Sequence, residues 1–265
     1  MLKLTNVTKT FAKGTVNEKT ALAGIDLHLE KGDFVTVLGS NGAGKSTLFG
    51  AIAGTFLPDT GSVILDGRDI TRLPDYKRSK HIGRLFQDPL KGTAPGMTIE
   101  ENLALAYMRA SAHTSPFSMI SKGDRAEFRD RLATLGLGLE NRMDQPVGLL
   151  SGGQRQALTL LMATLVTPQL LLLDEHTAAL DPATAEKVLQ LTKTIVSTHG
   201  ITCLMITHNI PSALSLGNRT IMMNAGKIVL ELSGKARKEM TAEDLLQAFH
   251  DQSAISDRML FSAGC

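Results

Sequence analysis

The chain has 265 residues, of which 28 are lysine or arginine and 26 are aspartate or glutamate, so its formal net charge is +2. Apolar residues make up 43% of the sequence, which is too many for a disordered chain and enough for a core. The near balance of charges gives no electrostatic reason to expect a nucleic-acid partner, and no apolar run is long enough to span a bilayer.

The start of the chain and its cysteines bear on location. Met1–Thr10 carries polar residues throughout and lacks the apolar stretch of a secretory signal. Cys203 and Cys265 lie far apart and have no metal-binding spacing, and Cys203 falls in an apolar run where a small core residue is expected. These features predict a chain kept in a reducing, cytosolic compartment.

The first third of the chain predicts strands arranged around one helix. Apolar and polar residues alternate over Leu2–Val7 and Ala23–Leu29, which is typical of half-buried strands, with a polar loop at Ala12–Thr20. The apolar run Asp33–Leu38 predicts a buried strand. Further elements predicted here are a helix over Lys45–Ala53 that Gly54 ends, and a strand over Ser62–Leu65 before a tight turn at Asp66 and Gly67.

From about residue 88 to 165 the strand patterns disappear, which predicts an inserted helical subdomain between two parts of a core, 1–87 and 166–235. A charged tail over 236–265 is predicted to be helical, because Thr241–Asp244 fits a capping box ahead of Leu245, Leu246 and Phe249. The helices predicted in the insertion are Ile99–Arg109, Asp124–Leu135 and Gly153–Val166. The elements predicted after it are strands at Leu170–Asp174, Ile201–Thr207 and Thr220–Met223 and a helix at Ala183–Thr198. The alternation of buried strands and helices predicts an α/β fold with a largely parallel sheet.

A glycine-rich run, which we call the phosphate loop (Gly39–Thr47), joins the third strand to the first helix. It fits the pattern G-x-x-x-x-G-K-[ST], with a strand before it and a helix after it, as this motif requires. Glycines let successive backbone N–H groups point at one anion, and the helix N-terminus adds positive potential. Lys45 is expected to reach the β- and γ-phosphates of a nucleotide, and Ser46 to bind Mg²⁺. The residues assigned to nucleotide binding in this loop are Gly39, Ser40, Asn41, Gly42, Ala43, Gly44, Lys45, Ser46 and Thr47.

A second nucleotide-binding pattern follows the apolar strand at Leu170–Asp174. Such a strand carries its last side chains to the sheet edge where open α/β sheets place ligands. Asp174 is expected to hold the metal, and Glu175 to polarise the attacking water. An apolar strand followed by Asp-Glu is weak evidence alone, and it gains its weight from the phosphate loop.

A third run, Ser151–Gln154, begins a predicted helix, and we call it the signature run. A serine and two glycines at a helix N-terminus can present N–H groups and a hydroxyl to an anion. Because the chain already has a phosphate loop, this second phosphate-binding helix end is interpreted as serving another subunit's nucleotide. The alternative is an ordinary helix N-cap, worth about 1 kcal/mol to the helix.

These runs, in this order, resemble the ATP-binding subunits of ABC transporters over about Leu2–Glu231. The resemblance implies a P-loop NTPase (RecA-like) core with an N-terminal antiparallel β-subdomain and an inserted α-helical subdomain. It implies ATP hydrolysis with Mg²⁺. It further implies a head-to-tail dimer with a second copy or a homologous ATPase, in which Ser151, Gly152, Gly153 and Gln154 contact the partner's ATP. Membrane permease subunits, an extracytoplasmic substrate-binding protein and a place at the inner face of the membrane follow from the same resemblance.

The resemblance also implies roles for four further residues. Gln87 would sense Mg²⁺ and link the core to the helical subdomain, His208 would contact the γ-phosphate, and Asp181 would lie in a loop that crosses the dimer interface. Phe11 stands where the family usually stacks a tyrosine on adenine, and because stacking tolerates any base, GTP stays possible. Each has an ordinary alternative: a surface glutamine, a core histidine, a helix N-cap and a core phenylalanine.

One position departs from the family, because His176 follows Glu175 where proline is usual. With Glu175 intact, hydrolysis is expected to survive, and His176 either hydrogen-bonds near the site or, the favoured alternative, simply fills the position. The run Asp174–Pro182 is similar to that of tryptophan/tyrosine importer ATPases, and Met97–Leu103 to that of amino-acid importers, including the branched-chain type.

The free-standing cassette favours import of an amino acid or a similar small solute. The competing function is a soluble ABC ATPase of the iron–sulfur assembly type. A monomeric P-loop kinase or GTPase would leave the signature run unexplained.

Overall fold

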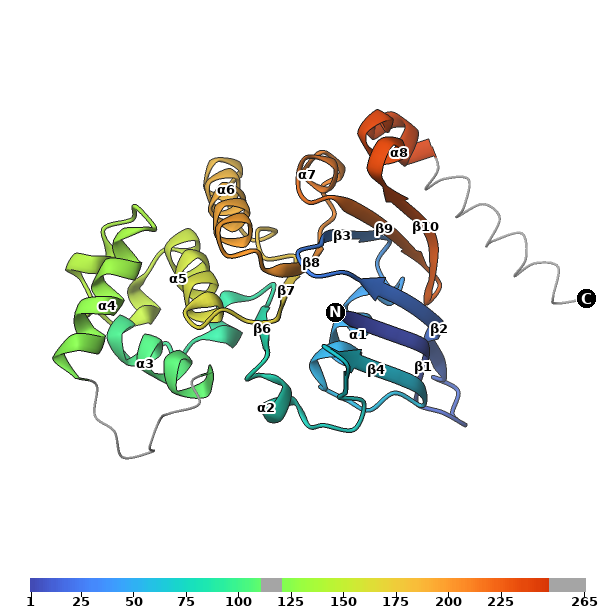
Figure 1. The fold of residues 1–265 in the computed structure, drawn as a ribbon, viewed down its shortest axis with the longest axis horizontal. Coiled ribbons are helices and arrows are strands. Elements are labelled where there is room, and N and C mark those ends of the chain that lie inside the picture. The colour runs from blue at the N-terminus through green and yellow to red at the C-terminus, as the bar shows by residue number, and fades with distance from the viewer. Residues whose placement is uncertain (111–120, 248–265) are drawn as a thin grey trace, which may run out of the picture. The chain divides into compact units, whose positions relative to one another are not determined.

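The computed structural model describes residues 1–110 and 121–247. The chain forms two compact units (Figure 1), one made of Met1–Arg78 with the described residues from Thr202 onward, and the other of Ser79–Ile201. Within the described residues, no helix is both long and apolar enough to cross a bilayer.

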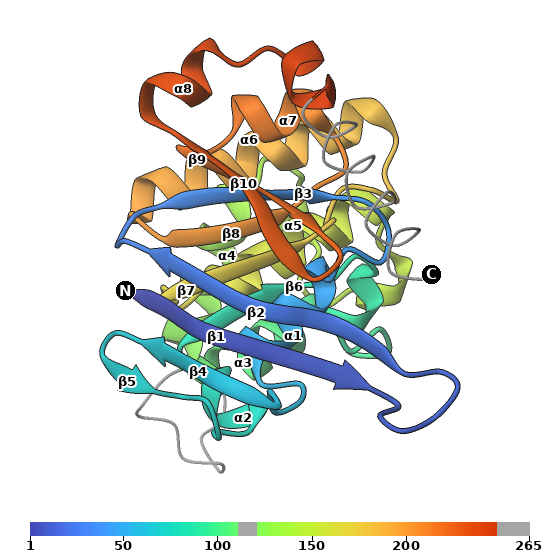
Figure 2. The same cartoon turned by 90° about the vertical axis from the view of Figure 1, so that its right-hand side faces the viewer.

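The first unit opens with an antiparallel sheet in the order β2-β1-β4-β5, whose strands run side by side in Figure 2. Its strands are β1 (Leu2–Phe11), β2 (Lys19–Leu29), β4 (Thr60–Leu65) and β5 (Arg68–Asp69). Alternate residues such as Leu2 and Leu4 are buried, which is the period expected when one face of a sheet packs on a core. The sheet is the antiparallel β-subdomain that the family resemblance implied.

The second sheet of this unit carries the phosphate loop. Its strands are β3 (Phe34–Gly39), β8 (Thr202–Ile206), β9 (Arg219–Asn224) and β10 (Lys227–Ser233), in the order β10-β9-β3-β8. β3 runs parallel to both β8 and β9, and β10 pairs antiparallel with β9. Every residue of β3 and β8 is buried, as expected for parallel strands that are covered on both faces.

Short helices cover these sheets. The unit contains α1 (Lys45–Ala53), α2 (Asp75–Arg78), α7 (Ile210–Ser215) and α8 (Gly234–Glu239). α1 packs against β2 and β3, α7 against β3, and α8 against β9 and β10. The predicted capping box forms, since Asp244 N–H donates to Thr241 Oγ1 over 3.1 Å and Thr241 N–H to Asp244 Oδ2 over 3.0 Å, and residues 242–247 are helical. Phe249 and Cys265 lie outside the described residues, whereas Cys203 is fully buried in β8 as predicted.

Arg78 ties the end of α1 to the chain that follows the first sheet. Its buried guanidinium donates to the carbonyls of Ala51 and Ile52 in the last turn of α1, each over 2.8 Å, and to those of Leu73 and Thr71. A cation is favourable at a helix C-terminus, where backbone carbonyls lack intrahelical partners. Burial lowers the pKa of Arg78.

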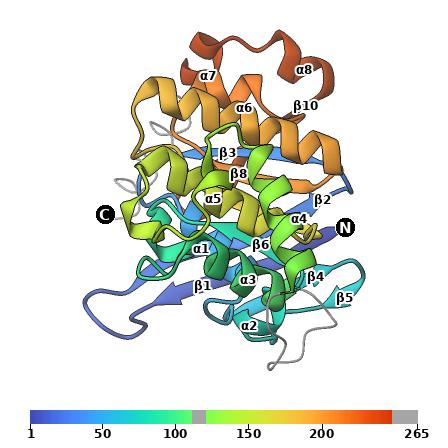
Figure 3. The ribbon, with the colours of Figure 1, turned by 90° about the vertical axis from the view of Figure 1, so that its left-hand side faces the viewer.

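The second unit is mostly helical. Its elements are β6 (Ile82–Leu85), α3 (Ile99–Ala110), α4 (Lys122–Ala133), α5 (Gly152–Thr164), β7 (Leu170–Asp174), α6 (Pro182–His199) and the 3₁₀ turns η1 (Pro89–Gly92), η2 (Leu139–Asn141) and η3 (Val147–Leu149). β6 and β7 pair in parallel. Helices α3, α4 and α5 pack on one another (Figure 3) around a cluster that includes Ile99, Phe128 and Leu158.

The predicted elements are present with shifted ends, and the helix at Lys45–Ala53 and the strand at Leu170–Asp174 match residue for residue. Six short helices and strands, α2, β5, β6, α7, β10 and α8, were not predicted from the sequence, and neither were the three 3₁₀ turns. β6 has only four residues and includes a glycine, so it shows too little alternation to be recognised. β10 follows the two-residue turn Ala225-Gly226, and both turn residues have positive φ, as a type I′ hairpin requires. The domain limits 1–87, 88–165, 166–235 and 236–265 stay a prediction.

Candidate nucleotide-binding site

The phosphate loop is held against two strands of its own unit. Gly39 has φ 153° and Gly44 has φ 101°, and a Cβ atom on either would lie 2.4 Å from a backbone carbonyl, that of Met223 or that of Ala21. No side chain fits at such a distance, so glycine is required at both positions for packing as well as for backbone conformation. The loop is therefore fixed between β9 and β2.

Lys45 lies inside this loop and is 6% exposed. Its ammonium donates to the carbonyls of Gly39 and Ser40 over 2.9 and 3.0 Å. The charge that would meet a phosphate is thus already positioned within the loop. Ser40, Asn41, Gly42 and Ser46 are exposed, whereas Ala43 and Gly44 are buried and Thr47 is half-buried.

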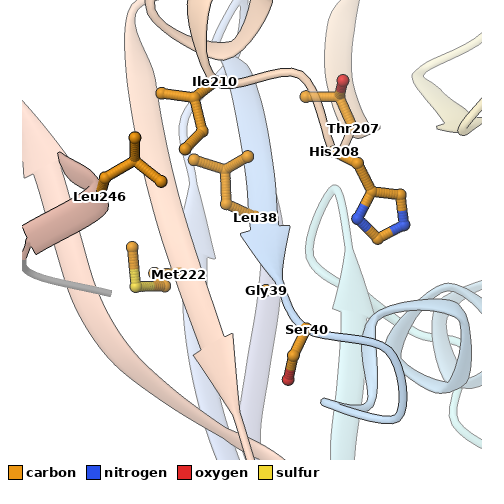
Figure 4. A pocket seen from close by; sticks show the side chains of 8 residues that line it. All are labelled: Leu38, Gly39, Ser40, Thr207, His208, Ile210, Met222 and Leu246. Carbon is orange, nitrogen blue, oxygen red and sulfur yellow. The ribbon is translucent and has the colours of Figure 1, made fainter. Parts of the chain in front are cut away.

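His208 follows β8 and comes to the same sheet edge as the phosphate loop. It lines one cavity of about 230 Å³ together with Gly39 and Ser40 (Figure 4). The carboxyl ends of parallel strands β3 and β8 meet at this edge, which brings residues 169 positions apart onto one wall. The remaining lining residues are Leu38, Thr207, Ile210, Met222 and Leu246.

Phe11 ends β1 and is 40% exposed. Its ring meets that of Phe56 edge to face, with centroids 5.4 Å apart, and Lys9 Nζ lies 5.6 Å from its centroid. Phe56, which no sequence motif singles out, is therefore part of the surroundings of the residue expected to stack on the base. Only the tertiary fold brings the two rings together, since they lie 45 positions apart in the sequence.

In the second unit, Asp174 ends β7 and Glu175 follows it, and Arg84 stands on the neighbouring strand β6. Burial lowers the pKa of Arg84, and the negative charge of Asp174 partly offsets that shift. Glu175 has φ 46°, a left-handed conformation that costs a non-glycine residue about 1–3 kcal/mol and is found preferentially at functional sites. The position of Arg84 near Asp174 was not predicted, because neither strand's sequence indicates that β6 pairs with β7. Gln87 lies just beyond β6 and is exposed.

His176, next to Glu175, turns into the core and is 3% exposed. Its Nε2 lies 3.1 Å from Thr192 Oγ1, and that hydroxyl donates to the carbonyl of Val188 over 2.8 Å. Because the hydroxyl proton is used in that way, the network assigns the proton of the neutral imidazole to Nε2. Burial lowers the pKa of His176 to about 4. His176 thus anchors β7 to α6 through a hydrogen bond.

The signature run forms a capping box at the start of α5. Gln154 N–H donates to Ser151 Oγ over 3.3 Å, and Ser151 N–H donates to Gln154 Oε1 over 3.2 Å. The helix N-cap named as the alternative role of this run therefore forms, while Ser151 and Gly152 remain exposed. A helix end can cap itself and still offer its remaining N–H groups to an anion.

Thr184 joins the signature run to Asp181. A Cβ on Gly153 would lie 2.1 Å from Thr184 Cγ2, so glycine is needed for α5 to approach α6. Asp181 is the N-cap of α6 and accepts a hydrogen bond from Thr184 N–H over 3.1 Å, and its hydrogen bonds with Thr184 hold its pKa below the usual value. The signature run and the loop at Asp181, which are both predicted to face a partner subunit, therefore both contact Thr184.

Each unit carries one set of the predicted residues. The first unit carries Phe11, the phosphate loop and His208, and the second carries Gln87, the signature run, Asp174, Glu175 and Asp181.

Comparison with known proteins identifies the family of this chain. The family described as ABC transporter matches residues 22–178. The chain belongs to the ABC transporter ATP-binding family. It is 41% identical to the tyrosine transport ATP-binding protein of Clostridioides difficile (strain R20291), over 94% of this chain and 98% of that protein. It is 34% identical to a methionine import ATP-binding protein of Haemophilus influenzae (strain 86-028NP), over 94% of this chain and 71% of that protein.

Solved structures agree with this assignment. A dimeric, post-hydrolysis state of an ATP-binding cassette bound to ADP and Pi superposes with a TM-score of 0.76 at 31% identity, over 88% of this chain and 98% of that one. The chain is accordingly an ATP-hydrolysing, nucleotide-binding subunit of an ABC transporter with a P-loop NTPase core. The iron–sulfur assembly alternative gains no support from these relatives, whose names are those of transport subunits.

Proposed function

We propose that this subunit powers the import of an amino acid, with tyrosine or a related aromatic amino acid as the first candidate. The observation that carries the proposal is the 41% identity to a tyrosine transport ATP-binding protein along nearly the whole of both chains. The methionine import relatives favour import as the direction.

The chemistry follows from the residues of the two sets. Lys45 and the N–H groups of the phosphate loop would bind the β- and γ-phosphates of ATP. Glu175 would accept a proton from the attacking water, and His208 would hold the γ-phosphate from the edge of β8. Phe11 would stack on the base.

The donor set fits Mg²⁺. Ser46 would offer a hydroxyl, Gln87 an amide oxygen and Asp174 a carboxylate, which are the hard oxygen ligands that this ion prefers. Bound Mg²⁺ would neutralise charge on the phosphates. The protein residues would orient the nucleotide around it, and Glu175 would remain available as the base.

The subunit would act as a head-to-tail dimer. Dimeric cassettes are known among its structural relatives, and the exposed residues Ser151 and Gly152 offer a helix end to a second nucleotide. Closing and reopening of the dimer would be passed on to integral membrane permease subunits. An extracytoplasmic binding protein would deliver the solute. The subunit would lie peripherally on the inner face of the membrane.

Uptake by the reconstituted transporter tests this function. The subunit, co-purified with its permease and placed in vesicles containing ATP, should accumulate labelled tyrosine in the presence of the binding protein. The matched control is Glu175→Gln, which should still bind ATP but lose both ATPase activity and uptake, because the proton acceptor is gone while the phosphate contacts stay. Uptake of methionine but not of aromatic amino acids would contradict the substrate, and unchanged turnover in Glu175→Gln would contradict the role of that residue. Purification in a wholly soluble complex would favour the assembly alternative.

A further inference from the structure

The first residues of strand β2 lie against the phosphate loop. The Ala21 carbonyl lies against Gly44, and the turn at Gly226 joins the strand to the loop, since Ala23 N–H donates to Gly226 O over 2.9 Å and Gly226 N–H donates to Ala43 O over 3.0 Å. These contacts fix the start of β2 beside the tip of the loop.

Lys19 is the first residue of β2, two positions before Ala21. Its ammonium lies 3.3 Å from the point where a Cβ of Gly42 would be, which places a second cation at the phosphate loop besides Lys45. Lys19 is exposed, so its charge is available to a bound anion. The nearest carboxylate in sequence, Glu18, accepts a hydrogen bond from Gly14 N–H over 2.7 Å.

The pairing of β1 with β2 sets Lys19 relative to the base. Lys19 is the register partner of Phe11, the residue expected to stack on adenine, and the two strands lie side by side in Figure 2. Lys19 is therefore a neighbour both of Phe11, the residue expected to stack on the base, and of Gly42 in the phosphate loop. In a nucleotide, the group between the base with its ribose and the β- and γ-phosphates is the α-phosphate.

We propose that Lys19 is a nucleotide-binding residue whose ammonium pairs with the α-phosphate of ATP and ADP. The proposal rests on the phosphate loop being the nucleotide site. A lysine ammonium is a mobile point charge, unlike the rigid, planar guanidinium of an arginine. Lys19 therefore adds affinity for the nucleotide without fixing the geometry of the γ-phosphate. Binding that is equal in the ground state and the transition state lowers KM and leaves kcat unchanged.

Nucleotide titrations of variants test the proposal. Lys19→Ala should raise the Kd for ATP and for ADP by the same factor, about three- to tenfold at low salt, because both nucleotides carry the α-phosphate. Lys19→Arg should bind within about twofold of the unaltered chain, since it keeps the charge. At saturating ATP, kcat of Lys19→Ala should stay within about twofold. The matched control is Lys31→Ala, an exposed lysine beyond the other end of β2, which should bind both nucleotides as the unaltered chain does.

The outcomes separate this proposal from the site on which it rests. Lys45→Ala should bind ATP weakly. If it does and Lys19→Ala binds like the unaltered chain, Lys19 is not a nucleotide-binding residue. If Lys19→Ala lost affinity for ATP but not for ADP, the contact would be with the γ-phosphate, and the assignment to the α-phosphate would be wrong. If Lys45→Ala binds ATP normally, the phosphate-loop assignment fails, and the proposal for Lys19 fails with it.

Discussion

Neighbouring residues at the end of β7 have opposite environments. Glu175 takes a left-handed backbone conformation and is half-buried, whereas His176 is buried and bonded to Thr192 on α6. A buried hydrogen bond beside a strained residue can hold the strained conformation in place, because breaking it would leave polar groups unpaired. The histidine at the position where the family usually has proline thus anchors the chain next to Glu175.

The burial of His176 predicts a dependence of stability on pH. Its pKa is about 4 in the folded chain, against 6.5 for an unperturbed histidine. Since the unfolded chain binds the proton more readily, the free energy of unfolding should fall as pH drops from 6.5 towards 4. Between pH 7.5 and 5 this group should account for about 2 kcal/mol. Urea denaturation of His176→Gln, which can still donate to Thr192, should show a smaller loss over that range. Equal losses in the two chains would contradict the assignment.

Helix contacts in the second unit depend on the absence of a side chain. Gly153 lets the start of α5 lie against Thr184 in the first turn of α6, while Asp181 caps the same helix. The signature run and the loop containing Asp181 are therefore parts of one helix junction. A change to one of them should be transmitted to the other through packing.

This junction predicts an effect of Gly153→Ala on stability. The added methyl group would overlap Thr184 Cγ2, and the β-branched threonine side chain has little rotamer freedom on a helix. The free energy of unfolding should therefore fall by about 1–3 kcal/mol. Thr184→Ser removes Cγ2, so the double variant should recover much of the loss in thermal or urea denaturation. Gly96→Ala, where a Cβ meets nothing within 4 Å, is the control and should change stability by less than about 0.5 kcal/mol. Additive losses in the double variant would exclude the proposed overlap.

At the scale of the whole molecule, the residues predicted to bind nucleotide fall into two sets. The phosphate loop and His208 belong to one unit, and Asp174, Glu175 and the signature run belong to the other. In the head-to-tail dimer proposed above, Lys45 and Glu175 of one chain would serve one ATP, and the signature run that completes the site would come from the partner.

Mixing inactive variants tests this division. Lys45→Ala and Ser151→Arg should each have little ATPase activity alone. Their equimolar mixture should regain activity, because a mixed dimer contains one site with an intact phosphate loop from one chain and an intact signature run from the other. Lys45→Ala mixed with Glu175→Gln should stay inactive, since every site then carries one of the two defects. Failure of the first mixture to recover, with dimers present on gel filtration, would contradict sharing of the signature run.

The local motifs were readable from the sequence because their chemistry is carried by contiguous residues. The phosphate loop needs glycines, a lysine and a serine at fixed spacing between a strand and a helix, and the helix Lys45–Ala53 and the strand Leu170–Asp174 were predicted to the residue. The order of the motifs indicated the family.

The tertiary structure determined which residues that are distant in sequence contact one another. It turned His176 into the core and set Thr184 against Gly153, and strand pairing placed Lys19 beside Phe11. It also revealed Phe56 next to Phe11. Hydrophobic patterns specify that a residue is buried but not which distant residue covers it, since many apolar partners satisfy the same pattern. The sequence by itself therefore determined the phosphate chemistry, and only the folded chain determined the contacts that hold it in place.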